Sequence, residues 1–103
     1  SVVEIYEQNG KLFGKVVQLA STVKSQICNK CEGELKNKPI VGMVILKNLT
    51  KTENGGKDGE ILDPNNGKTY SCYVELVAPD KLKLRGFIGF SALGRTQYWY
   101  RAK

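Results

Sequence analysis

Residues 60–101 have the sequence EILDPNNGKTYSCYVELVAPDKLKLRGFIGFSALGRTQYWYR. Four short segments of strand-like composition lie between three turn signals, and apolar residues do not recur at the helical period. The stretch therefore predicts an all-β fold. It contains no group of residues that specifies a reaction, so the class of fold is better determined than the biochemical function.

Turns are predicted at residues 63–67 (DPNNG) and 79–80 (PD), where Pro, Asn and Gly favour the backbone angles of turns. The predicted strands of this stretch are residues 60–62, 68–78, 81–90 and 96–101. Side chains alternate between the two faces of a strand. Alternation within residues 81–90 thus separates an apolar face from one that carries Lys81, Lys83, Arg85 and Phe87.

The upstream half predicts three more strands. Residues 2–8 and 11–19 flank Asn9-Gly10, the strongest signal for a tight hairpin, and residues 39–46 are almost continuously apolar. Residues 20–38 predict a long loop, and the charged, glycine-rich residues 47–59 predict a flexible connection. Seven strands joined mostly by hairpins predict an antiparallel up-and-down β-barrel. Because closed barrels of this kind usually have an even number of strands, we expect either a strand absent from this chain or an additional one within the two loops.

The length of 103 residues fits one domain, residues 1–103. No apolar run approaches the roughly 20 residues that span a bilayer, so no transmembrane segment is predicted. The net charge is +6, and residues 81–103 contain six Lys or Arg and no Asp or Glu. Such a concentrated positive charge attracts anionic partners.

Five ordered blocks of sequence carry a resemblance to a known family. They are GKVVQL (14–19), CNKCEG (28–33), KPIVGMVIL (38–46), ILDPNNGKTY (61–70) and LKLRGFIGFSALGRTQ (82–97). Together they resemble the bacterial domain of unknown function 2147 over essentially the whole chain. The resemblance implies a small exported protein with a lipocalin-like or calycin-like β-barrel, made with a signal peptide and located in the periplasm or secreted. The family pattern begins earlier, with a Gly-x-Trp first strand, which implies an eighth, N-terminal strand ahead of Ser1. No activity is settled for the family, so no site residues follow from it.

The cysteines do not predict a metal or redox site. A zinc site needs four ligands, and the chain has no histidine and only Cys72 beyond the Cys28–Cys31 pair. The pair also lacks the strand-to-helix setting of a thioredoxin-type motif. In an exported protein, as the resemblance implies, a Cys28–Cys31 disulfide is expected to hold the loop. No cofactor is predicted.

Catalysis is not predicted either. Cys72 shares the apolar face of residues 68–78 and is expected to be a small buried side chain. Without histidine it lacks the usual base, and the same absence argues against Ser-His hydrolases. Glu60 and Asp63 lie near a turn, but an Asp before Pro is ordinary turn chemistry. We therefore expect a protein that is not an enzyme.

Two faces of the last strands are candidate sites. The apolar face is expected to line the barrel interior with Leu82, Leu84, Ile88, Phe90, Tyr98 and Tyr100. Such an interior is either filled by side chains or holds one small ligand, and Gly42, Gly86 and Gly89 favour a cavity. The opposite, basic-aromatic face is expected to bind an anion or a partner with Lys83, Arg85, Phe87, Trp99 and Arg101.

A pairing in which residue numbers sum to 186 would set Phe87 opposite Trp99 and Arg85 opposite Arg101, so that like charges face each other. Glu75 and Tyr73 on the preceding strand offer an alternative, an ordinary salt-bridged surface. The leading hypothesis is an exported β-barrel that binds a small apolar or amphipathic molecule. An anionic molecule is one version of this hypothesis. The alternatives are a protein that docks an envelope or host partner, and a nucleic-acid binder, against which export argues. The oligomeric state is left open.

Overall fold

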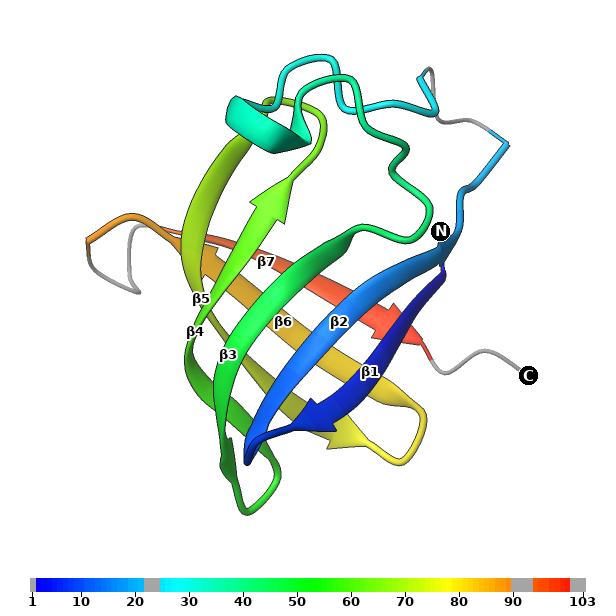
Figure 1. Ribbon diagram of the computed structural model, residues 1–103. Coiled ribbons are helices and arrows are strands. Elements are labelled where there is room, and N and C mark those ends of the chain that lie inside the picture. The colour runs from blue at the N-terminus through cyan, green and yellow to red at the C-terminus, as the bar shows by residue number, and fades with distance from the viewer. Residues whose placement is uncertain (1, 22–24, 90–93, 101–103) are drawn as a thin grey trace.

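The computed structural model describes residues 2–21, 25–89 and 94–100. In this part of the chain, seven antiparallel strands form one sheet in the order of the sequence, curled into a half-barrel (Figure 1). The strands are β1 (Val2–Gln8), β2 (Lys11–Gln18), β3 (Val44–Thr52), β4 (Gly55–Asp63), β5 (Lys68–Ala78), β6 (Lys81–Phe87) and β7 (Gly94–Tyr100), and a 3-10 helix, η1, covers Gly33–Leu35. The predicted all-β, up-and-down architecture is confirmed.

Turns form at the predicted residues 9–10, 63–67 and 79–80, whereas the turn at residues 53–54 was not predicted. Asn9 and Gly10 join β1 to β2 with φ angles of 54° and 77°, the left-handed values that a type I′ turn requires. In the turn between β4 and β5, the Asn65 amide donates to Asp63 Oδ1 over 2.9 Å. These local hydrogen bonds and backbone preferences determine the positions at which the sheet reverses direction.

The prediction of a flexible connection over residues 47–59 is wrong, because these residues complete β3 and begin β4. Two of the glycines lie under Leu49, which is fully buried. A Cβ at Gly59 would lie 2.6 Å from Leu49 Cδ2, and one at Gly56 would lie 3.0 Å from Leu49 Cβ. The glycines therefore make room for a core side chain inside the sheet.

The strand predicted over residues 39–46 forms only from Val44 onward, where β3 begins, so its predicted start is wrong. Residues 39–43 bind the preceding loop instead. Pro39 forms an isolated bridge with Ile27, and the Ile40 amide donates to the Gln26 carbonyl over 2.9 Å. Gly42, with φ of 93°, then turns the chain into β3. The apolar run is explained by burial under the loop rather than by strand pairing.

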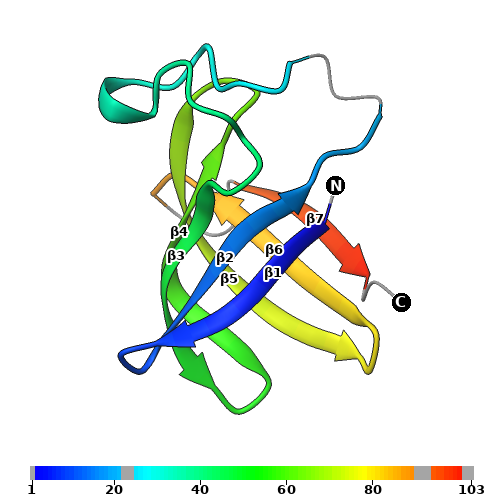
Figure 2. The ribbon, with the colours of Figure 1, turned by 45° about the vertical axis from the view of Figure 1, so that its right-hand side comes forward.

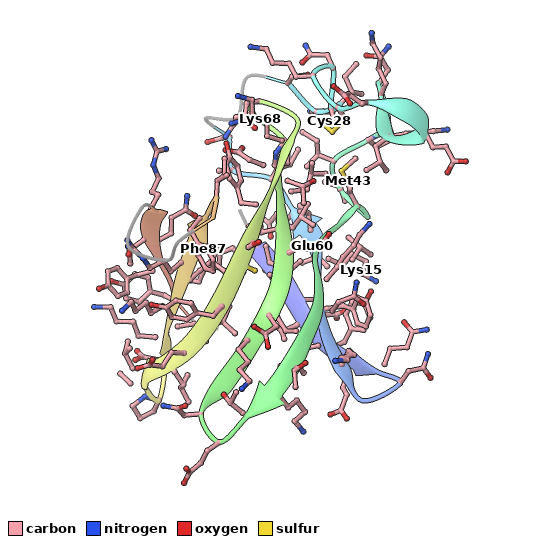
Figure 3. The ribbon with its side chains drawn as sticks, turned by 90° about the vertical axis from the view of Figure 1, so that its left-hand side faces the viewer. Lys15, Cys28, Met43, Glu60, Lys68 and Phe87 are labelled. Atoms are coloured by element: carbon pink, nitrogen blue, oxygen red, sulfur yellow. A yellow bond between two sulfur atoms is a disulfide. The ribbon has the colours of Figure 1, made fainter. Side chains whose placement is uncertain are left out.

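The segment between β2 and β3 covers one end of the half-barrel (Figure 1, Figure 2). Cys28 and Met43 lie at this end, near Lys68 at the start of β5 (Figure 3). A side chain at Gly67 would collide with the Lys30 carbonyl, which shows how closely the segment packs on the turn. The segment forms one core cluster with the ends of the strands, made of Val16, Cys28, Cys31, Ile40, Met43, Ile45 and Leu62.

A second core cluster lies inside the sheet. Its buried members are Leu46, Leu49, Cys72, Val74 and Leu84, against which Leu12, Ile61, Leu82 and Trp99 pack. β1 and β7 are the two end strands of the sheet, and among the described residues they do not pair with each other. The start of β1 and the end of β7 lie on the same side of the molecule (Figure 2). The interior is thus packed on the β2–β5 side and bounded by two end strands on the other.

Candidate ligand-binding cavity

A cavity of about 1260 Å³ occupies the rest of the interior. Both end strands contribute to its lining, Val3 and Ile5 from β1 and Gln97 and Trp99 from β7, so the cavity reaches the opening between them. The volume exceeds the roughly 300–1,000 Å³ of typical small-molecule pockets. Apolar side chains make up much of the wall, including Val16, Ile45, Ile61, Leu76, Leu82 and Leu84.

The register of β6 with β7 determines which side chains face this cavity. Leu82 pairs with Trp99, Leu84 with Gln97 and Gly86 with Arg95, so paired residue numbers sum to 181. Leu84 is buried in the interior cluster, and its partners across the ladder therefore point inward as well. The inward residues of β7 are Arg95 and Gln97, which are exposed to solvent in the open cavity, and Trp99, which is half-buried.

The expected pairing with a sum of 186 is wrong, and the odd shift exchanges the two faces of β7. Trp99 points inward instead of belonging to the basic-aromatic face. Tyr98 and Tyr100, predicted to line the interior, pair with Lys83 and Lys81 and are 49% and 67% exposed. Both still border the cavity, at its rim. The register differs because β6 ends at Phe87 and β7 begins at Gly94, whereas the predicted strands end at residue 90 and begin at residue 96.

The remaining predicted interior residues divide into three groups. Leu82 and Leu84 face inward as expected. Ile88 borders the cavity beyond the end of β6 and is 67% exposed, so it is not part of the filled core. Phe90 lies outside the described residues.

One end of the cavity is polar. It is lined by Asp63 at the end of β4, Asn66 in the following turn and Tyr70 in β5. Arg95 lines it from the start of β7. Asn66 Nδ2 donates to the Tyr70 hydroxyl oxygen over 2.9 Å. This leaves the hydroxyl proton of Tyr70 available to an acceptor in the cavity.

The floor between Tyr70 and Arg95 is bare because Gly86 lies there. A Cβ at Gly86 would lie 3.6 Å from Ile61 Cγ2 and 3.7 Å from Tyr70 Cβ, which is ordinary contact. Unlike Gly56 and Gly59, Gly86 therefore has room for a Cβ, and it borders the cavity. The expectation that Gly86 leaves room for a cavity agrees with this geometry.

The outward face of β5–β7 carries cationic and aromatic side chains. We define the outer basic face as Tyr73, Lys81, Lys83, Arg85, Phe87, Tyr98 and Tyr100. Lys81 Nζ lies 4.5 Å from the centroid of the Tyr98 ring, and Arg85 Nη1 donates to Thr96 Oγ1 over 2.6 Å. Thr96, and not Arg101, is thus the partner of Arg85 on β7; Arg101 lies outside the described residues. Glu75 pairs with Lys83 and Tyr73 with Arg85, as the alternative interpretation expected.

The cysteines occupy two buried environments. Cys28 and Cys31 form a disulfide with their Cα atoms 5.3 Å apart, as expected. Cys72 is a free thiol, 1% exposed, and it packs as a small buried side chain. Burial, together with the nearby negative charge of Glu60, raises the pKa of Cys72 from 9.0 to about 12.

Within the described ranges, no three Cys, Asp or Glu side chains lie close enough together to hold a metal ion. None of the described helices has the length and apolar character needed to cross a membrane.

Sequence reasoning missed Arg95 and Gln97 as cavity residues. Arg95 precedes the predicted last strand, and Gln97 lies on the predicted strand face that was expected to point outward. The alternation of Arg95, Gln97 and Trp99 is visible in the sequence, but it does not state which alternate set faces inward. That choice depends on the length of the connection between β6 and β7.

The fold has a counterpart among known proteins. The structure resembles protein HP1028 from the human pathogen Helicobacter pylori, described as belonging to the lipocalin family, with a TM-score of 0.86 and 25% sequence identity over 98% of this chain and 71% of that chain. Among curated proteins, none matches the sequence. The family model for uncharacterised proteins conserved in bacteria, domain of unknown function 2147, matches residues 1–101. The chain therefore belongs to the bacterial family of domain of unknown function 2147.

Proposed function

We propose that this chain binds one small apolar or amphipathic molecule in the interior of its half-barrel. The observation that supports the proposal is the cavity of about 1260 Å³, which is lined by more apolar than polar surface and has polar groups at both ends. Small β-barrels either fill their interior with side chains or hold one ligand, as lipocalins do. Here the leucines over Gly56 and Gly59 fill one part, while the space over Gly86 stays open.

We further propose that the chain is not an enzyme. The sequence contains no histidine. Cys72 is a poor nucleophile, because a thiol with a pKa of about 12 is almost entirely protonated at neutral pH. Turnover of a bound ligand by the purified protein would contradict this proposal.

Export to the periplasm or beyond is part of the same proposal. The Cys28–Cys31 disulfide supports it, because disulfides persist in oxidising compartments and are rare in the bacterial cytoplasm. The test is cell fractionation of the full-length natural protein. Recovery of reduced protein from the cytoplasmic fraction would overturn this part.

The test of ligand binding uses Trp99, the chain's one tryptophan, as an intrinsic reporter on the cavity wall. Native mass spectrometry after incubation with a lipid extract identifies bound molecules, and Trp99 fluorescence follows their titration. The variant Gly86→Leu projects a side chain into the cavity and is expected to reduce affinity at least tenfold. The matched control Ser71→Leu adds the same side chain on the outward face, where Ser71 is exposed. Binding that is equal in both variants, or absent in the wild type, would refute the proposal.

A second candidate function, docking of an acidic partner, is supported by the outer basic face. Lys81, Lys83 and Arg85 alternate along the outside of β6 beside exposed tyrosines. The residue that opposes this charge from β5 is Glu75. The partner is proposed to be an envelope or host component; an oligonucleotide is the competing outcome of a binding assay.

A further inference from the structure

Arg95 occupies a distinctive position in the cavity. It pairs with Gly86 across the ladder from β6 to β7, so its side chain leaves the sheet on the inward face above a residue that has none. Ion pairs among the described residues join Lys15 to Glu4 and Lys51 to Glu7, both on the exposed side of the sheet, and neither involves Arg95. A guanidinium cannot lose its charge at physiological pH. The cavity wall thus carries a permanent cation without an acidic partner among the described residues.

Tyr70 lines the same cavity as Arg95, and Gly86 lies between the strands that carry them. The β5 partner of Gly86 is Cys72, so Tyr70 lies two residues farther along β5. With strands about 4.8 Å apart and a rise of about 3.4 Å per residue, the backbones of Tyr70 and Arg95 are about 12 Å apart on a diagonal. Both side chains are long enough to converge on one small group lying over Gly86. Tyr70 accepts a hydrogen bond from Asn66 and can donate its own proton to that group.

The acid at the same end, Asp63, is engaged in the turn. Its Oδ1 accepts the Asn65 amide, and its carbonyl accepts the Gly67 amide over 2.8 Å. From this polar end the wall continues to Leu84, Leu82 and Trp99 along β6 and β7. Gln97 interrupts this wall, and Asp80 and Lys81 line the far end, so the apolar stretch lies between two polar ends of the cavity.

We infer that the ligand is an amphipathic anion, whose carboxylate or phosphate group is bound by the Arg95 guanidinium and the Tyr70 hydroxyl, and whose apolar body lies along Leu84, Leu82 and Trp99. The inference rests on the proposed function and adds the chemical class and orientation of the ligand. Charge-assisted hydrogen bonds from Arg are strong, and a planar fork matches a carboxylate or phosphate with two parallel bonds.

The experiment uses probes with one dodecyl tail and different head groups: dodecanoate, dodecyl phosphate, dodecanol and dodecyltrimethylammonium. Affinities are measured by isothermal titration calorimetry and by Trp99 fluorescence, below the concentration at which each probe forms micelles. The variants are Arg95→Gln, Arg95→Lys and Tyr70→Phe. Lys47→Gln is the matched control, because it removes one positive charge from an exposed outward position on β3.

We expect the two anions to bind at least tenfold more tightly than dodecanol. Arg95→Gln should remove that preference without changing the affinity for dodecanol, and Arg95→Lys should restore part of it. Tyr70→Phe should weaken the anions alone, and Lys47→Gln should change nothing. Tail-dependent binding that ignores the head group, or that Lys47→Gln weakens as much as Arg95→Gln, would overturn the inference and leave the proposed function standing. If no probe binds and the lipid extract also yields no ligand, the proposed function itself fails.

Discussion

Cys72 links the packing of β5 to the pH dependence of stability. Its pKa is raised to about 12 by burial, while an unfolded chain exposes the thiol at its ordinary value of 9.0. Between these values the unfolded state loses a proton that the folded state keeps, so the free energy of unfolding falls as pH rises. Below pH 9 the contribution is fully present.

We therefore expect the difference in unfolding free energy between the wild type and Cys72→Ala to shrink from pH 9 towards pH 12. Urea unfolding of both proteins at a series of pH values measures this difference. Lysine and tyrosine side chains titrate in both proteins, so their effects cancel when the two free energies are subtracted. A difference that stays constant over this range would mean that the thiol titrates equally in both states.

Two inward glycines should respond in opposite ways to the same added methyl group. At Gly59 the new Cβ would lie 2.6 Å from Leu49 Cδ2 and 2.9 Å from the Lys47 carbonyl oxygen, so the strands must shift. We expect Gly59→Ala to cost about 1–3 kcal/mol, as overpacking does. Gly86→Ala meets nothing closer than 3.6 Å and should change stability by less than about 1 kcal/mol. Equal costs in urea unfolding would contradict the distinction between packed and open interior.

At the scale of elements, the pairing of β6 with β7 predicts a contrast between adjacent aromatic residues. Trp99 packs against the interior cluster, whereas Tyr100 is 67% exposed on the other face. Trp99→Ala should lower the free energy of unfolding by about 2–4 kcal/mol, and Tyr100→Ala by less than about 1 kcal/mol. The reverse order would favour the pairing in which Trp99 faces outward. Thermal or urea unfolding of both variants decides between the registers.

The elements differ in how well the sequence predicts them. The strand Lys68–Ala78 has its predicted bounds because Gly67 and Pro79-Asp80 mark both of its ends. The parts of β3 and β4 within residues 47–59 were missed, since a glycine that admits Leu49 has the same sequence signature as a glycine in a flexible loop. The connection at residues 88–93 carries no signal that determines its length, so the inward residues of β7 could not be assigned. The apolar face of β6 was predictable; Arg95, on the strand across from it, was not.

For the whole molecule, the uneven charge predicts salt-sensitive adhesion through the outer basic face. Residues 81–103 contain no acidic residue, and Lys81 and Lys83 are on the outward side of β6. We expect Lys81→Glu with Lys83→Glu to weaken binding to vesicles of anionic phospholipid at least tenfold, and we expect wild-type binding to fall steeply as salt rises. The control pair Lys47→Glu with Lys57→Glu changes the net charge equally on β3 and β4. If both double variants lose vesicle affinity equally, binding depends on net charge alone and the outer basic face is not the binding surface.

The order of the strands also bears on how the chain assembles. Each strand pairs with its neighbour in the sequence, and short turns make all but two of these connections. Local pairing of this kind lowers the entropic cost of the folding barrier and speeds folding. Residues 19–43 form the longest connection, between β2 and β3, and closing it costs the most chain entropy. We expect the hairpin of β1 and β2 and the meander that begins at β3 to form as separate nuclei, so that their docking, which also buries the disulfide-bonded segment, limits the rate at which the cavity comes into existence.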